Sequence, residues 1–234
     1  ARFGVPNLGD LTEIVDPPVV DAVTAGWPCQ PVSLAGKRAG VDDERWLIRD
    51  VVTVARQAGA QWILMENVRG LLSANQGEAF GQVLDALADG GFNVRWSCLR
   101  ADQSVGACHR RDRWFGVAHL ADTPSAERRI PQHDAVGASI GRTAEPGERY
   151  RPSAWGRFEP SIRRWEAVMG RASPAPIDDG KLSPLWCEWA MGLPNGWVTD
   201  ISLSRAEALR ILGNGCIPQH AGVGFRWLLD QEPF

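Results

Sequence analysis

The sequence predicts an α/β protein built on a layered, mostly parallel sheet. Three observations support this prediction: short apolar runs alternate with amphipathic helical patterns over the first 120 residues, the connections are short, and turn residues separate the segments. Ligands of such sheets bind beyond the carboxyl ends of the strands, so we expect a functional site there.

The first three predicted elements lie between residues 19 and 67. Residues 19–26, VVDAVTAG, form an apolar run bounded by prolines and a glycine, which predicts a buried strand. Residues 45–59 carry apolar side chains at helical spacing and end at a glycine, which predicts a helix. Residues 61–67, QWILMEN, predict a second short buried strand.

The next three predicted elements complete this region. Residues 75–91 place apolar side chains on one helical face before a Gly-Gly pair, which predicts an amphipathic helix. Residues 92–100 alternate apolar and polar side chains, as a half-buried strand does. Residues 113–120 predict a further strand, close enough in the chain to pair with the preceding one.

The pattern changes after residue 120. Residues 121–180 are rich in Pro, Gly, Ser and Arg with little periodicity, which indicates a long loop or a small separate domain. Regular structure is predicted again over 183–194 and over 204–230, where two helices are separated at Gly213-Asn214-Gly215.

Composition narrows the class of protein. The 234 residues are 44% hydrophobic and 23% charged with a net charge of −3, which is typical of a globular domain and does not by itself indicate nucleic-acid binding. Lysine occurs only at Lys37 and Lys181, so the positive charge is mostly guanidinium; this suits phosphate contacts, and a GC-rich genome explains it equally well.

Several classes of protein are excluded by the sequence. The five cysteines are scattered without paired spacing, which argues against a disulfide scaffold and against a metal site. The sequence shows neither a signal peptide nor a membrane-spanning run, so we expect a cytoplasmic protein without membrane partners.

Two polar positions follow predicted strands. Cys29 comes directly after the first strand and Glu66 lies at the end of the second, so both could reach one cleft. Each has a structural explanation when taken alone, because a single cysteine is commonly a packed small hydrophobe and a Glu-Asn pair often forms a turn.

Taken together, several segments resemble motifs of the phage and bacterial cytosine carbon-5 DNA methyltransferases. Matches in the family's order run from about Asp10 to Leu229 and leave 121–180 unmatched. The segments are GWPCQPVSLAGKRAG (26–40), ILMENVRGLL (63–72), VGACHRRDRWFGVA (105–118), LSPLWCEWAMGLPNGW (182–197) and LRILGNGCIPQHA (209–221).

This resemblance implies a fold and a division of the chain. The fold would be a Rossmann-like S-adenosylmethionine-dependent methyltransferase sheet with a small, irregular target-recognition region. The catalytic domain would occupy residues 1–120 and the target-recognition region 121–181. The remaining segment, 182–234, would return its last helices to the catalytic domain.

The resemblance also implies a DNA (cytosine-5-)-methyltransferase activity with S-adenosylmethionine as cofactor. The thiolate of Cys29 would add to carbon 6 of a cytosine flipped out of double-stranded DNA, which activates carbon 5 for methylation. Glu66 would stabilise or protonate ring nitrogen 3, provided that partial burial keeps a proton available. Arg113 and Arg111 would anchor the base carbonyl and the surroundings of the thiolate.

Further residues are assigned by the same resemblance. The cofactor would be held by Asp10 and Leu11 at the adenine, by Pro28, and by Asn214 near the methionine end. The DNA-binding candidates are Gln30, Ser33, Lys37 and Arg38; for the last two, solvent exposure is an almost equally good interpretation.

The sequence also departs from the family pattern. Within the third motif, Cys108 and His109 replace the usual Pro and Gln. The opening Phe-x-Gly-x-Gly loop and the acidic residue after it are not found, so the sheet is expected to be N-terminally truncated and the isolated chain to bind S-adenosylmethionine poorly. A catalytically silent fragment that needs a partner with this loop is therefore an alternative, and an RNA cytosine methyltransferase is a second one.

Overall fold

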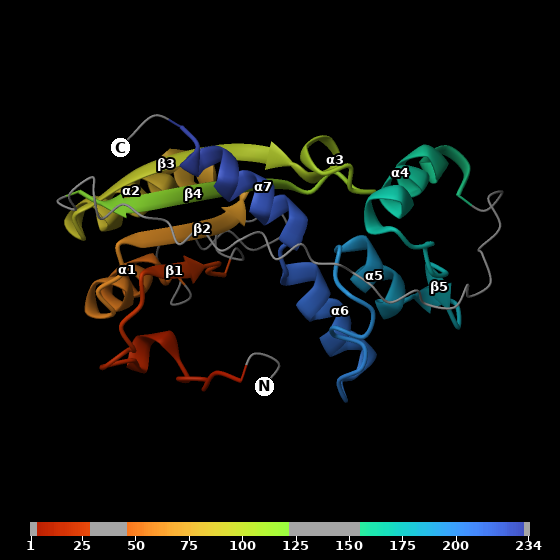
Figure 1. Ribbon diagram of the computed structural model, residues 1–234, viewed down its shortest axis with the longest axis horizontal. Helices are drawn as coiled ribbons and strands as arrows, with labels where there is room; N and C mark the ends of the chain where they lie inside the picture. The colour runs from red at the N-terminus through yellow and green to blue at the C-terminus, as the bar shows by residue number, and fades with distance from the viewer. Residues whose placement is uncertain (1–3, 29–45, 122–154, 232–234) are drawn as a thin grey trace. The chain divides into compact units, whose positions relative to one another are not determined.

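The computed structural model describes residues 4–28, 46–121 and 155–231 (Figure 1). The chain divides into two compact units, which are described separately below. Unit 1 comprises residues 1–98, 113–128 and 225–234, and unit 2 comprises residues 99–112 and 129–224. None of the helices in the described ranges has the length and apolarity needed to cross a membrane.

A four-stranded sheet organises unit 1, with the strand order β1-β2-β4-β3. Strand β1 runs parallel to β2, and β2 runs antiparallel to β4. The strands are β1 (Ala22–Ala25), β2 (Trp62–Val68), β3 (Phe92–Arg100) and β4 (Asp112–Leu120).

The expectation of a mostly parallel sheet is therefore wrong, because the described sheet is mixed. Residues 101–111 join β3 to β4, and this connection is too short for the crossover that a parallel return requires. The alternation of strands and helices that defines the α/β class is confirmed.

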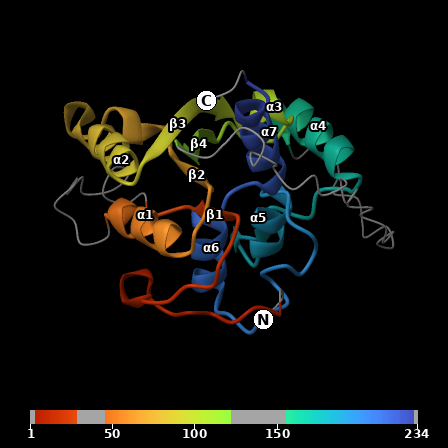
Figure 2. The ribbon, with the colours of Figure 1, turned by 60° about the vertical axis from the view of Figure 1, so that its left-hand side comes forward.

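Two helices cover the core of unit 1, α1 (Ile48–Gln57) and α2 (Glu78–Asp89). They contact each other and lie on the same side of the strands in the turned view (Figure 2). Each buries one face, because its apolar side chains recur every three or four residues. In the described part of the unit, short 3-10 turns occur at η1 (Leu11–Glu13), η3 (Arg69–Leu72) and η4 (Ala74–Gly77).

Unit 2 is mainly helical and packs around buried tryptophans, Trp165 and Trp189 among them. Its helix α4 lies in the region where the sequence shows little periodicity. The expectation that this region is irregular is therefore wrong for the residues that form α4. The elements are α3 (Ala101–Ser104), η6 (Gly156–Phe158), α4 (Glu159–Met169), β5 (Ile177–Asp178), β6 (Lys181–Leu182), α5 (Pro184–Ala190), α6 (Arg205–Asn214) and α7 (Pro218–Leu229), of which the last continues into unit 1.

A glycine on β4 makes room for a buried ring beneath the sheet. A Cβ atom at Gly116 would lie 2.4 Å from a ring carbon of Trp114, which is fully buried. We expect Gly116→Ala to lower the free energy of unfolding by about 1–3 kcal/mol, the usual cost of overpacking a core. Urea denaturation measures this difference.

Gly81 provides the matched control for that substitution. It lies inside α2, and a Cβ atom there would meet nothing within 4 Å. Gly81→Ala should instead raise the free energy of unfolding by about 0.5–1 kcal/mol, because alanine has the higher helix propensity. Similar values for the two variants would contradict the packing of Trp114 over Gly116.

Candidate functional site

An ion pair between Glu66 and Arg113 joins β2 to β4 near the carboxyl end of β2. Arg113 Nε lies 2.9 Å from Glu66 Oε1, and the two side chains are 17% and 18% exposed. Val68 lies opposite Arg113 in the strand register, so Glu66 is the diagonal neighbour of Arg113 on the same sheet face. Partial burial reduces solvent screening, and this pair is therefore stronger than an ordinary surface pair.

The chain that leads into Cys29 lies directly beside this pair. A Cβ atom at Gly26 would be 3.8 Å from Glu66 Oε2, which is ordinary van der Waals contact. The carbonyl of Trp27 accepts a hydrogen bond of 3.4 Å from Nδ2 of Asn67, which is 2% exposed. Asn67 Oδ1 in turn accepts from the backbone N–H of the next residue at 2.8 Å. Glu66 thus forms the ion pair with Arg113, and the adjacent Asn67 binds the backbone of Trp27, two residues before Cys29 in the sequence.

The predicted nucleophile itself lies outside the described residues. The same holds for all four predicted DNA contacts: Gln30, Ser33, Lys37 and Arg38. Pro28 is the last described residue before Cys29 and is exposed. The role of each of these residues stays a prediction.

Arg111 is held within unit 2 by the end of α6. Its Nη2 donates to the carbonyl of Gly213 at 3.2 Å and to the carbonyl of Gly215. These carbonyls flank Asn214, the exposed last residue of α6. Carbonyls at a helix C-terminus have no partner in the helix, and a cationic side chain is well suited to them. The structure thus brings Arg111 together with the predicted cofactor residue Asn214.

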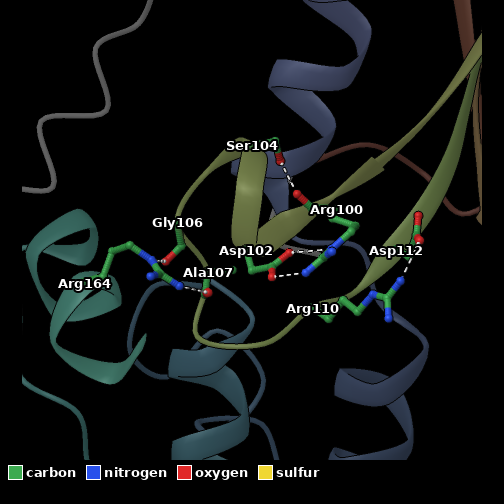
Figure 3. Close-up of polar contacts among 8 residues, drawn as sticks. All are labelled: Arg100, Asp102, Ser104, Gly106, Ala107, Arg110, Asp112 and Arg164. Carbon is green, nitrogen blue, oxygen red and sulfur yellow. Dashed lines mark hydrogen bonds and ion pairs between the residues drawn. The ribbon is translucent and has the colours of Figure 1, made fainter. Parts of the chain in front are cut away.

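The segment that carries Arg111 folds back on itself between β3 and β4 (Figure 3). The backbone N–H of Ala101 donates to the carbonyl of Arg110 at 2.9 Å, which closes the base of this loop. Arg100 makes two contacts with Asp102, Nε to Oδ1 at 3.1 Å and Nη2 to Oδ2 at 2.5 Å. This hydrogen-bonded pairing raises the pKa of Arg100 and lowers the pKa of Asp102.

Two side chains fix the same loop to the helices of unit 2. Arg164 of α4 donates from Nε to the carbonyl of Gly106 at 3.1 Å and from Nη2 to the carbonyl of Ala107 at 3.4 Å (Figure 3). His109 Nε2 lies 3.0 Å from the carbonyl of Ala190, so this nitrogen carries a proton and donates it. The histidine found where the family has glutamine therefore still serves as a hydrogen-bond donor. Arg164 was not among the predicted residues, because no local pattern marks it.

Asp10 caps the short turn η1 at the surface of unit 1. Its Oδ1 accepts from the backbone N–H of Thr12 at 2.9 Å and from the Thr12 hydroxyl at 2.7 Å. The hydrogen bond from the backbone lowers the pKa of Asp10 most, and the bond from the Thr12 hydroxyl lowers it further. Leu11 is half-buried against the core. An ionised surface carboxylate beside an apolar side chain fits the adenine end of S-adenosylmethionine, because it accepts from an amino group.

Two of the described cysteines are poorly suited to act as nucleophiles. Burial raises the pKa of Cys108 to about 12, and it raises the pKa of Cys187 as well. A nucleophilic cysteine needs an accessible thiolate near neutral pH. Cys108 therefore does not compete with Cys29 for this role, although it lies in one of the motif segments.

Comparisons of the sequence and of the structure find relatives of this chain. The sequence model of the family "C-5 cytosine-specific DNA methylase" matches residues 1–147. The Type II methyltransferase M.BsuFI of Bacillus subtilis is 39% identical over 116 residues, which cover 48% of this chain and 28% of that protein. The Type II methyltransferase M.MspI of Moraxella sp is 25% identical over 246 aligned residues, which cover 92% of this chain and 58% of that protein. The chain thus spans less than two thirds of the length of these relatives.

Solved structures show the same fold. The Dnmt2 methyltransferase of S. pombe superposes with a TM-score of 0.52 at 17% identity, over 90% of this chain and 78% of the other. The methyltransferase EhMeth of Entamoeba histolytica gives a TM-score of 0.54 at 14% identity, over 91% and 78%. The predicted Rossmann-like methyltransferase fold is confirmed.

Proposed function

This chain belongs to the C-5 cytosine-specific DNA methylase family, and we propose that it acts as a DNA (cytosine-5-)-methyltransferase. The observation that carries the proposal is the Glu66–Arg113 ion pair beside the segment that enters Cys29. Cys29, the proposed nucleophile, follows Gly26 by three residues in the sequence.

The proposed reaction begins with a cytosine flipped out of duplex DNA. The thiolate of Cys29 donates an electron pair to carbon 6, and the ring electrons shift from the C5–C6 bond toward ring nitrogen 3. Glu66 gives a proton to nitrogen 3, which leaves a neutral enamine with a nucleophilic carbon 5. S-adenosylmethionine, when bound, supplies the methyl group to carbon 5. A solvent base then takes the carbon-5 proton, the C6–S bond breaks to return the thiolate, and nitrogen 3 gives its proton back to Glu66.

The ion pair assigns a second role to Arg113. In the free protein the guanidinium of Arg113 contacts the Glu66 carboxyl group, with Nε 2.9 Å from Oε1. A bound cytosine offers its carbonyl oxygen to the same guanidinium and competes with Glu66 for it. We infer that base binding loosens the pair and leaves Glu66 available to nitrogen 3. Glu66 would then take up a proton from solvent and pass it to ring nitrogen 3.

The binding residues belong to the same proposal. Asp10, Leu11, Pro28 and Asn214 would hold the cofactor, and Arg111 would support Asn214 through the end of α6. Gln30, Ser33, Lys37 and Arg38 would contact double-stranded DNA. The division into a catalytic domain (1–120), a target-recognition region (121–181) and a C-terminal segment (182–234) belongs to this proposal too, as does a cytoplasmic location.

A partner segment with a glycine-rich loop is a second component of the proposal. Strand β1 lies at one edge of the described sheet and pairs there with β2 in parallel. The outer side of an edge strand presents backbone N–H and C=O groups to which another strand can pair. Its edge could therefore accept a further strand, contributed by an N-terminal fragment or by a second subunit.

The decisive experiment uses duplexes in which 5-fluorocytosine replaces cytosine throughout, incubated with S-adenosylmethionine. Fluorine cannot leave carbon 5 as a proton does, so the adduct persists and mass spectrometry identifies the attached residue. We expect the adduct on the peptide containing Cys29, and an adduct on any other residue would overturn the assignment.

Two further arms separate the alternatives. An adduct that forms only after addition of an N-terminal segment of a family relative, carrying the glycine-rich loop, would show that the chain is a complementing fragment. Equal methylation of transfer RNA and duplex DNA by the active preparation would favour an RNA substrate. No adduct in either preparation would contradict the proposed activity.

A further inference from the structure

Arg110 is an exposed arginine on the loop that joins β3 to β4 (Figure 3). Its side chain is 69% exposed, and its Nη2 lies 3.9 Å from Oδ2 of Asp112, which is too far for a hydrogen bond. An exposed contact of this kind contributes little to stability. In the part of the chain that the structure describes, this guanidinium makes no other ion pair or hydrogen bond. Arg110 therefore carries a positive charge that the protein neutralises only weakly.

The other arginines in and against this loop are engaged within the protein. Arg100 makes two contacts with Asp102, whereas Arg111 and Arg164 donate to backbone carbonyls, which bind a guanidinium without neutralising it. The hydrogen bond from Asp102 raises the pKa of Arg100 most, and the charge of Asp112 raises it as well. Asp112 thus interacts with a second cation besides Arg110. The arginines and aspartates named for this loop leave an excess of positive charge.

The backbone that carries Arg110 is fixed by its surroundings. The backbone N–H of Ala101 donates to the carbonyl of Arg110 at 2.9 Å. The next residue, Arg111, has a φ of 32°, in the left-handed region that residues with a side chain rarely adopt. Such a conformation persists only where the surrounding contacts require it, and here the guanidinium of Arg111 is bound to the end of α6. The loop is therefore preorganised, which lowers the entropic cost of binding a ligand at Arg110.

Arg110 also lies close in the chain to the residue proposed to hold the base. It precedes Arg113 by three residues, and three residues of extended chain span at most about 10–11 Å. A DNA strand carries one phosphate for about every 3.4 Å of helix axis. A cytosine held at Arg113 would therefore bring about three phosphates of its own strand within that distance. A guanidinium with a weak internal partner is well suited to bind a phosphate there.

We propose that Arg110 contacts the phosphate backbone of duplex DNA on the strand that presents the target cytosine. This inference rests on the proposed function, which supplies DNA as the substrate. The phosphate would replace Asp112 as the partner of the Arg110 guanidinium, and Asp112 would keep its interaction with Arg100. Phosphate contacts fix the register of a protein on DNA without reading its sequence. Arg110 would thus add affinity and orientation, and not sequence specificity.

The contact is tested by the salt dependence of DNA binding, which needs neither the cofactor nor the adduct. Fluorescence anisotropy of a labelled duplex of about 20 base pairs gives the binding constant between about 50 and 200 mM salt. We expect Arg110→Gln to make the slope of log K against log salt shallower by about 0.9, the contribution of one phosphate contact. Binding at about 0.1 M salt should weaken by about three- to tenfold. Arg110→Lys keeps the charge and should retain the wild-type slope.

Arg56→Gln is the matched control, because Arg56 is an exposed arginine of α1 that precedes the amino end of β2, whereas Glu66 lies near the carboxyl end. Its loss should leave the slope unchanged.

Four results would overturn the contact. They are equal slopes for Arg110→Gln and Arg56→Gln, an Arg110→Lys slope as shallow as that of Arg110→Gln, wild-type protein that does not bind the duplex, and a lower urea midpoint for Arg110→Gln. The last would show that Arg110 holds the loop together. Duplex binding without adduct formation contradicts the proposed function instead, and the slopes still decide whether the phosphate contact exists.

Discussion

Replacing Glu66 by glutamine should slow adduct formation with the 5-fluorocytosine duplexes by about 10²–10³-fold, the usual contribution of a positioned acid. Glutamine keeps the size of the side chain but has no proton to give to ring nitrogen 3. It also removes the negative charge that pairs with Arg113 at 2.9 Å. The pair is partly exposed, so the fold should be retained, and the rate constant of adduct formation at saturating duplex is the quantity to measure.

Three comparisons make this result specific to the site. Cys29→Ser is the negative control and should form no adduct, because its hydroxyl is not ionised near neutral pH. Arg113→Lys keeps the charge without the planar fork, so it should retain more activity than Arg113→Ala. The matched control is Arg49→Ala, which breaks a pair of similar length (3.1 Å) whose side chains are 62% and 70% exposed. If Glu66→Gln is no slower than Arg49→Ala, Glu66 is not the acid.

The strands and helices that could be predicted from the sequence are those with a local cause. The apolar run before Gly26 and the run that ends at Glu66 are long enough to identify β1 and β2, and their parallel pairing brings both ends together. The direction of β4 could not be predicted in this way, because it depends on which neighbour the strand joins. Helix α4 was missed although Ile162, Trp165 and Met169 recur at helical spacing, because the surrounding Pro- and Arg-rich composition suggested a loop.

The contacts that hold the candidate site come from distant parts of the sequence. Arg111 bonds to carbonyls at residues 213 and 215, and Arg164 bonds to residues 106 and 107. No periodic pattern marks such pairs, since each side chain is an ordinary arginine in its own neighbourhood. The resemblance to the family identified Glu66 and Arg113 as separate motif residues. Only the structure shows that they form a pair, and that Trp27 packs against Trp46.

Glu188→Ala should lower the free energy of unfolding by about 3–5 kcal/mol, because it removes a buried carboxylate that accepts several hydrogen bonds. Glu188 is 1% exposed on α5. Its carboxylate accepts from the backbone N–H groups of Gly196 (2.8 Å), Val198 and Thr199 (3.1 Å), and from the Thr199 hydroxyl (3.0 Å). Alanine would remove the acceptor that these donors share and open a cavity beside them.

The turn at residues 196–199 depends on a glycine to bring its N–H groups to the Glu188 carboxylate. Gly196 has a φ of 73°, and a Cβ atom there would lie 2.0 Å from a carboxylate oxygen of Asp200, so the turn that delivers the donors requires glycine. Glu188→Gln keeps one acceptor oxygen but turns an NH₂ group toward N–H donors, so its cost should be smaller, about 1–3 kcal/mol. Urea denaturation followed by tryptophan fluorescence measures both values.

Glu207→Ala is the control for this series, since Glu207 caps the exposed start of α6 in a capping box with Ser204. Its loss should cost only about 1 kcal/mol, because water replaces the lost hydrogen bonds. If Glu188→Ala costs no more than Glu207→Ala, the buried carboxylate does not organise the 196–199 turn. A large cost for Glu188→Ala with a small one for Glu188→Gln would show that acceptor oxygens, more than the negative charge, hold the turn in place.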